Sequence, residues 1–281
     1  MRLYKTLQRS TLLYGIELCD WDVDQVENLE ILQAKAIRTH FSLDRQCPKA
    51  TLRIVTGVEP FDARIDLHVL LYYAKLCLSD PSSFPSRIHK YRSRNDIAPP
   101  VGFHFTARYT MRKYGLVHLW REIKTNVDTK LKNMLKKSIW LHHWKADISA
   151  ALTSNSLFAP VFLKKISPPI QPYKVHPFLT SLHTQKFPRI AIARILRFWL
   201  TPARVRVCTC SSKTHDLVKH LLFSCPNTRA DVHAYAAKLE TLLFSCFTQS
   251  RLLDFLRIVV CSEKLLINFN LLVGTFQYPR Y

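Results

Sequence analysis

Hydrophobic residues recur at helical spacing in the first eighty residues. Steps of three and four residues link one apolar stripe between positions 22 and 41, made of Val23, Val26, Leu29, Leu32, Ala36 and Ile37. This periodicity predicts an amphipathic helix that begins at an Asp22/Gln25 capping box. A second predicted helix takes Pro60 as its first residue and ends before the run Ser79-Asp80-Pro81-Ser82-Ser83.

The helical pattern returns between residues 116 and 151. Trp140 and Trp144 fall on one face of this predicted helix, and we interpret them as core residues, although aromatics among lysines can also stack on bases. Prolines then interrupt the chain at positions 160, 168, 169, 172 and 177. Because proline breaks helices and central strands, this segment is predicted to be an extended connector.

Three shorter helices are predicted in the last third of the chain. Residues 189 to 200 alternate arginine with apolar positions and stop at Thr201-Pro202. Apolar positions at helical spacing between 232 and 246, and again between 252 and 260, predict two more. The sequence therefore predicts a mainly α protein with four consecutive regions: a helical region 1–80, a basic helical region 81–157, a Pro-rich connector 158–188 and a metal-bearing region 189–281.

The composition fits a folded chain and excludes several classes. Apolar residues make up 48% of the sequence, enough for a sizeable core. Five glycines, none close to another, cannot form a phosphate-binding loop of the Walker or Rossmann type. No apolar run approaches the roughly 18 residues of a membrane span, and the first residues lack a secretory signal, so a nuclear or cytoplasmic protein is expected.

Positive charge is least compensated by acidic residues between Lys130 and Lys213. The chain has 41 Lys and Arg against 20 Asp and Glu, a net charge of +21, and the segment from Lys130 to Lys213 holds fifteen basic residues and one acid, Asp147. Such a tract attracts RNA or DNA through phosphate contacts, or is the solvated face of a basic protein. The candidate nucleic-acid-binding residues are Lys130, Lys132, Lys136, Lys137, Lys164, Lys165, Arg189, Arg194, Arg197, Arg204 and Arg206.

A cysteine and histidine array predicts a structural zinc site. Cys208, Cys210, His220 and Cys225 have the spacing C-x-C-x9-H-x4-C, and His215 is an alternative to His220. Thiolates and an imidazole are the ligands of tetrahedral zinc, and four protein ligands leave no open position for catalysis. The alternative is a set of buried thiols beside an unrelated histidine.

Other candidate chemistry is sparse. The remaining cysteines, at positions 19, 47, 77, 246 and 261, lie among apolar neighbours and are predicted to be small buried hydrophobes. No hydrolase, kinase or zinc-protease motif occurs, and the pair His142-His143 is expected to have no carboxylate nearby to orient it, so it is interpreted as structural.

Two segments resemble one protein family. Leu3-Tyr-Lys-Thr-Leu, Leu13-Tyr-Gly-Ile-Glu with Trp21, Leu32-Gln-Ala-Lys-Ala-Ile-Arg and Thr56-Gly-Val-Glu-Pro are similar to the region after the polymerase palm in reverse transcriptases of non-LTR (LINE-type) retrotransposons. The array from Cys208 to Cys225, with Leu-Leu-Phe inside it, resembles the C-terminal cysteine-histidine motif of the same family.

This resemblance implies a thumb-like helical region, a basic connector and a zinc-knuckle-like tail. The family's polymerases hold two magnesium ions on palm aspartates, and this sequence contains no adjacent Asp-Asp pair, so no catalytic residue or magnesium site is assigned. The expected function is binding of nucleic acid without polymerase activity. The alternatives are a piece of a longer RNA-directed DNA polymerase, a protein-interaction module, and a decayed element without function.

Overall fold

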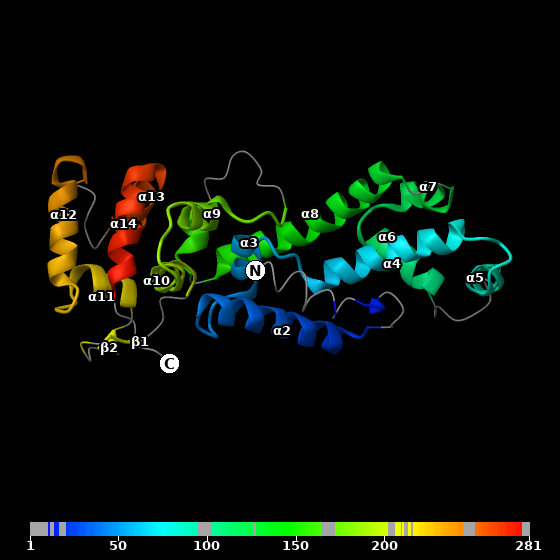
Figure 1. Cartoon of the computed structure of the whole chain (residues 1–281), viewed down its shortest axis with the longest axis horizontal. Coiled ribbons are helices and arrows are strands. Elements are labelled where there is room, and N and C mark those ends of the chain that lie inside the picture. Colours follow the sequence, from blue (N-terminus) through cyan, green and yellow to red (C-terminus); the bar gives the residue numbers. More distant parts are fainter. Residues whose placement is uncertain are drawn as a thin grey trace. The chain divides into compact units, whose positions relative to one another are not determined.

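The computed structural model describes residues 11, 14–16, 21–94, 103–125, 128–154, 156–163, 172–201, 206–208, 210, 213–214, 216–243 and 251–276. The described chain is mainly helical, as predicted, and it includes a two-stranded antiparallel hairpin (Figure 1). Contacts divide it into two compact units. Unit 1 combines residues from 1–33 and 59–146, and unit 2 combines residues from 34–58 and 147–281.

The two units differ from the four consecutive regions that the sequence predicts. Each unit is assembled from two separate stretches, and two of the three divisions fall inside the helices α2 (Val23–Phe41) and α8 (Thr129–Thr153). Sequence composition changes at Pro-rich or polar segments, whereas the compact units follow long-range contacts. Sequence composition alone could therefore not predict the boundaries of the two units.

The first predicted helix is confirmed as α2. The Gln25 amide donates to the Asp22 carboxylate at 2.7 Å, and the Asp22 amide donates to the Gln25 side chain at 3.2 Å, which is the reciprocal pairing of a capping box. The second is confirmed as α4 (Phe61–Leu78), which ends at Ser79. Pro60 is the N-cap of α4 and not its first helical residue, because its ψ of 154° is extended.

The rest of unit 1 is more interrupted than predicted. The polar segment after Ser79 contains a helix, and the predicted helix 116–151 is divided into three elements. Asp128 accepts the Leu131 amide at 2.7 Å and caps α8, which explains a new helix start in the middle of the predicted one. The further elements of unit 1 are α5 (Phe84–Arg94), α6 (Phe103–Lys113), η3 (Val117–Leu119) and α7 (Trp120–Thr125).

Helix α4 supplies the centre of the unit 1 core. Its Tyr73 is fully buried and stacks on Trp120 with ring centroids 4.9 Å apart, and α6 lies along α4 (Figure 1). Trp144 is buried, in line with its interpretation as a core residue, and Trp140 is half-buried against the core of unit 1. Helical spacing therefore predicted the buried face of α8 correctly.

Unit 2 contains the remaining described elements. The predicted helices that start at Arg189 and Leu252 are confirmed with nearly the same ends, whereas α14 is absent from the prediction. The elements are α3 (Lys49–Thr56), η4 (Ala159–Leu163), α9 (Pro177–Thr184), α10 (Arg189–Leu200), β1 (Arg206–Val207), β2 (Lys213–Thr214), α11 (Leu217–Phe223), α12 (Arg229–Leu243), α13 (Leu252–Cys261) and α14 (Glu263–Thr275).

The prediction of an extended Pro-rich connector is wrong for the described part of 158–188. Pro160 lies in the short helical element η4, and Pro177 is the first residue of α9, where a missing amide costs nothing. Phe158, Phe162 and Phe178 are buried and contact one another, and Phe162 and Phe178 also contact Trp199 of α10. The prolines of this segment alternate with large aromatic residues, and these residues form part of the hydrophobic core and not a linker.

A glycine allows the segment before α9 to approach α3. Gly57 ends α3 with a φ of +63°, and an added Cβ would lie 2.4 Å from the Val175 amide nitrogen. The next amide, that of His176, donates to the Val55 carbonyl at 3.0 Å. Glycine is required at this position both for its left-handed conformation and for the close approach of the two backbones.

No helix in the described ranges is both long enough and apolar enough to cross a membrane.

Candidate metal centre

Unit 2 brings Cys208, Cys210, His220 and Cys225 together. Their ligand atoms all lie within 4.8 Å of one another. The Sγ atoms of Cys208 and Cys225 are 3.5 Å apart, and the Cys210 Sγ is 3.2 Å from the His220 Nε2. Cys208, His220 and Cys225 are buried, and Cys210 is half-buried. Three thiols and one imidazole in a largely buried cluster can hold a metal ion.

A hairpin and a short helix supply the four side chains. Strands β1 and β2 pair with Arg206 opposite Thr214 and Val207 opposite Lys213, so Cys208 and Cys210 lie in the loop that joins them. His220 lies on α11, and Cys225 follows its end. The C-x-C spacing and the H-x4-C spacing thus correspond to two local structures that meet at the cluster.

Backbone and side-chain hydrogen bonds hold the helical half of the cluster. Asp216 caps α11 by accepting the Lys219 amide at 3.1 Å. The Cys225 amide donates to the His220 carbonyl at 2.7 Å, which turns the chain so that both side chains can reach the same point. The Thr228 hydroxyl donates to the Leu221 carbonyl and ties the turn to the start of α12.

The separations fit a tetrahedral zinc ion. With Zn–S distances of about 2.3 Å, two thiolates on one zinc lie about 3.8 Å apart, and a thiolate and an imidazole nitrogen lie about 3.5 Å apart. The observed 3.5 Å and 3.2 Å are only slightly shorter. Three thiolates and one imidazole favour zinc over magnesium or calcium, which prefer oxygen ligands.

The cluster is attached to the aromatic core of unit 2. Helix α11 packs against α12, and α12 packs against α14. Tyr235 of α12 contacts Phe269 of α14 with ring centroids 5.8 Å apart, and Phe269 in turn contacts Trp199 of α10. The Trp199 indole also donates to the Asn270 side chain at 3.1 Å. A metal ion in the cluster would therefore stabilise one edge of a continuous core.

His220 is the histidine that the described structure places in the cluster, whereas His215 lies outside the described residues. Of the other cysteines, Cys47 is buried and Cys77 is half-buried, in line with the prediction. Cys261 is exposed, so the prediction of burial is wrong for it, because it lies at the end of α13 on the outer side. Cys19 and Cys246 also lie outside the described residues.

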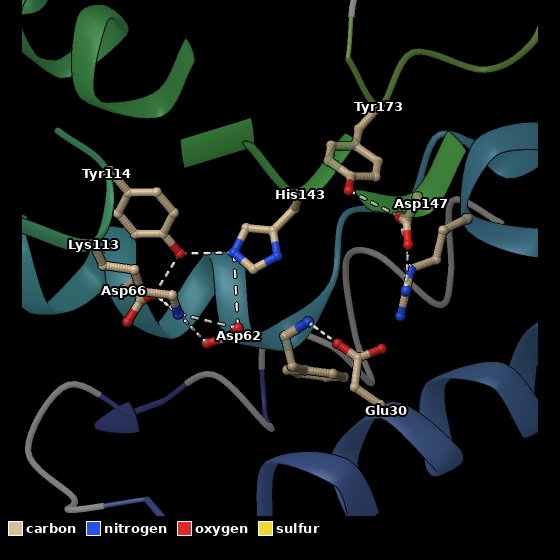
Figure 2. A network of polar contacts seen from close by, with 10 residues as sticks. Glu30, Asp62, Asp66, Lys113, Tyr114, His143, Asp147 and Tyr173 are labelled. Carbon is tan, nitrogen blue, oxygen red and sulfur yellow. Dashed lines mark hydrogen bonds and ion pairs between the residues drawn. The ribbon is translucent and has the colours of Figure 1, made fainter. Parts of the chain in front are cut away.

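Unit 1 contains a second polar cluster that sequence reasoning missed. The Tyr114 hydroxyl donates to the Asp66 carboxylate at 2.5 Å and lies 2.7 Å from the His143 Nε2 (Figure 2). His143 is also 3.7 Å from the Asp62 carboxylate. The expectation that no carboxylate lies near His142-His143 is therefore wrong. Asp62 and Asp66 share a face of α4, but only the fold shows that α8 passes beside them.

Lys113 occupies the centre of this second cluster. Its Nζ is 2.8 Å from Asp66 and 3.2 Å from Asp62. Burial raises the pKa of Asp66, although the Lys113 charge acts against that shift. Burial acts to lower the pKa of Lys113, but the two carboxylates outweigh it and raise that pKa. The cluster already contains its own cation, so it is an internal ion network and not a metal site.

The predicted nucleic-acid-binding residues are placed in both units. Lys130, Lys132 and Lys137 of α8 are exposed, and Lys136 lies over the Trp140 ring at 4.1 Å. In unit 2, Arg189 is exposed, whereas Arg194 donates to the Gly274 carbonyl at 2.9 Å and Arg197 to the Ser42 carbonyl at 2.7 Å. Arg206 lies in β1, and Lys164, Lys165 and Arg204 lie outside the described residues.

The single acid of the basic tract is buried. Asp147 is 3% exposed and pairs with Arg53 through two hydrogen bonds, one of 3.0 Å from Nε, while the Tyr173 hydroxyl donates to it at 2.9 Å (Figure 2). Its charge is thus compensated inside unit 2 and does not offset the exposed basic residues.

Comparisons of the chain with protein-family models, with curated proteins and with solved structures found no match.

Proposed function

We propose that Cys208, Cys210, His220 and Cys225 bind one structural zinc ion and that the chain binds nucleic acid without reading its sequence. The observation that carries the first part is the convergence of four zinc-type ligands to within 4.8 Å. Because all four ligands come from the protein, the zinc keeps no open position for a water or a substrate. Its role is to fold the segment from β1 to α12.

Exposed basic side chains support the second part of the proposal. Lys130, Lys132 and Lys137 extend from α8 into solvent, the net charge is +21, and the one acid of this tract is buried. Phosphate contacts by such side chains release counterions, which makes binding strongly salt-dependent and independent of sequence. Arg194 and Arg197 contribute less, because their guanidinium groups bond to carbonyl oxygens of unit 2.

The resemblance to non-LTR reverse transcriptases gives this proposal its context. Those proteins hold template RNA and target DNA on the regions that follow the palm. The present chain has no adjacent Asp-Asp pair, so two-metal nucleotide transfer has no carboxylates to organise it. We therefore expect binding without RNA-directed DNA synthesis by this chain alone.

The binding proposal is tested by measuring affinity for RNA and DNA oligonucleotides over a salt series. We expect a linear fall of log K with log salt, with a slope of about −0.7 per phosphate contact on single strands. Replacing Lys130, Lys132 and Lys137 together with Gln should reduce the magnitude of the slope by roughly 2, if each contacts one phosphate. Replacing Arg194 and Arg197 with Gln is the comparison variant and should change the slope little. No binding at about 50 mM salt would contradict the proposal.

A further inference from the structure

Helix α5 exposes a stripe that helices normally bury. Phe84, Arg87, Ile88 and Tyr91 stand at positions i, i+3, i+4 and i+7, the spacing of one helix face. Phe84 is 75% exposed, Tyr91 71% and Ile88 40%, and Arg87 is exposed as well. A stripe of this kind usually packs on a core, so its exposure marks it as a surface for a partner.

Helix α6 repeats the same arrangement. Phe105, Arg108, Tyr109 and Arg112 have the identical spacing, and all four are exposed, with Tyr109 at 60%. The buried side of α6 is formed by other residues, Ala107, Thr110 and Met111, of which Ala107 and Met111 belong to the core of unit 1. The exposed stripe is therefore not needed to hold α6 in place.

The two helices belong to the same part of unit 1. Each contacts α4, and α5 and α6 also contact each other (Figure 1). Phe103, at the start of α6, packs edge-on against Tyr72 of α4 with ring centroids 5.2 Å apart. The two stripes, which we call the aromatic–arginine stripes, are thus carried on anchored helices.

Charge decides which partner fits these stripes. Residues 84 to 113 contain seven Lys and Arg and one acid, Asp96. An apolar protein groove would have to desolvate the guanidinium groups of Arg87, Arg108 and Arg112 without a matching anion, which is costly. A polyanion with flat apolar groups matches both components, because phosphates pair with arginine and bases stack on tyrosine and phenylalanine.

We propose that the aromatic–arginine stripes of α5 and α6 bind single-stranded nucleic acid, with unpaired bases stacked on Tyr91 and Tyr109. The inference rests on the proposed function and adds to it a surface and a preference for single strands. In a duplex the base faces are covered by neighbouring bases, so these rings can stack only on unpaired bases. The lysines of α8 contact phosphates of either form and give no such preference.

The experiment compares the affinity of the full chain for a single-stranded oligonucleotide of about 20 nucleotides with its affinity for the matching duplex. Tyr91→Ala and Tyr109→Ala should each weaken single-strand binding by roughly tenfold, within the 1–3 kcal/mol range of base–aromatic stacking. Duplex affinity and the salt slope should stay unchanged, because no phosphate contact is lost. Tyr14→Ala, which removes a tyrosine that is 91% exposed and lies outside the stripes, is the matched control and should change neither affinity.

The possible outcomes distinguish failure of the stripe proposal from failure of the proposed function. Equal single-strand affinity of the wild type and both tyrosine variants, with binding intact, would overturn the stripe proposal and leave the proposed function standing. Absence of binding by the wild type at about 50 mM salt would overturn both. If the variants instead abolish self-association seen by sedimentation, while single-strand affinity stays the same, the stripes bind protein and the proposal is wrong. Circular dichroism confirms that these surface changes leave the helices folded.

Discussion

Each of the two compact units is stabilised internally by a different kind of interaction. In unit 1, an ion network of Asp62, Asp66 and Lys113 links α4 to α6, and Tyr114 and His143 extend it to α8. In unit 2, buried aromatic rings join η4, α9, α10 and α14, and a cluster of thiols and one imidazole lies at the edge of that core. Among the described residues, each unit thus has one polar cluster with metal-type ligands.

The difference between the clusters lies in what compensates their charge. Hard carboxylates in unit 1 have Lys113 between them, so they need no added ion. The thiols of unit 2 contact one another and one imidazole, and these ligand atoms match those of zinc sites. Proximity of metal-type residues is therefore insufficient to define a metal site; ligand softness and a competing cation decide it.

Metal removal should have the largest effect, and it should be confined to unit 2. Apparent zinc-binding free energies of small structural sites are about 10 kcal/mol or more, so chelation should unfold the segment from β1 to α12. Hydrogen exchange read by mass spectrometry should show lost protection there, with α4 and α6 unchanged.

Cysteine variants test the same cluster. Metal analysis should find about one zinc per chain in the wild type and none in Cys225→Ser. Cys261→Ser changes an exposed thiol outside the cluster and should retain the metal. Equal zinc content in both variants would contradict the proposal that this cluster binds zinc.

Breaking the ion network should produce a smaller effect, confined to unit 1. Lys113→Met leaves the carboxylate of Asp66, only 13% exposed, without its cation, and should destabilise unit 1 by about 2–3 kcal/mol. Denaturant unfolding followed by hydrogen exchange of α4 and α6 measures it. The double variant Lys113→Met/Asp66→Asn removes both charges and should recover part of the loss. A zinc-dependent change in unit 1 would contradict the distinction between the two clusters.

Acid should weaken unit 2 through His176. Burial lowers the pKa of this side chain from 6.5 to about 4, and its Nδ1 accepts the Phe178 amide at 3.1 Å, which requires the neutral ring. The unfolded chain binds the proton more readily, so stability present above pH 6.5 is lost as the pH falls toward 4. Between pH 7.5 and 4.5 the expected loss is about 2–3 kcal/mol.

The variant His176→Asn isolates this effect. Asparagine can still cap α9 but has no proton to gain, so the variant should show a weaker pH dependence of unfolding than the wild type. The cysteine and histidine cluster and Asp66 are common to both proteins, so their contributions cancel in the difference. Identical pH profiles would show that His176 does not titrate on unfolding.

The smallest predicted effect concerns the capping box of α2. Asp22→Ala removes one of two reciprocal hydrogen bonds and should cost about 1 kcal/mol in local stability at the start of the helix. Amide exchange of the first turn of α2 measures this loss. Asp22→Asn keeps the acceptor oxygen and should retain most of the protection.

Much of the helical structure could be predicted because its signals are local. The Asp22/Gln25 box, the stop at Ser79 and the stripe of α10 depend on neighbours within a few residues. The cysteine and histidine cluster could be predicted for the same reason, because its four residues span only eighteen positions of the sequence. Prolines misled the prediction at η4 and α9, because a proline at a helix start is indistinguishable by composition from one in a linker.

The sequence by itself determined the helical class, the basic surplus and a set of cysteine and histidine ligands at zinc spacing, because periodicity, charge and short-range spacing need no tertiary contact. Only the tertiary structure decided that Phe158 and Phe178 are core, that His143 meets Asp62 and Asp66, and that Tyr91 and Tyr109 remain exposed. Those outcomes depend on which distant segments cover a helix face, and amphipathic spacing alone cannot tell a face that packs on the core from one left for a partner.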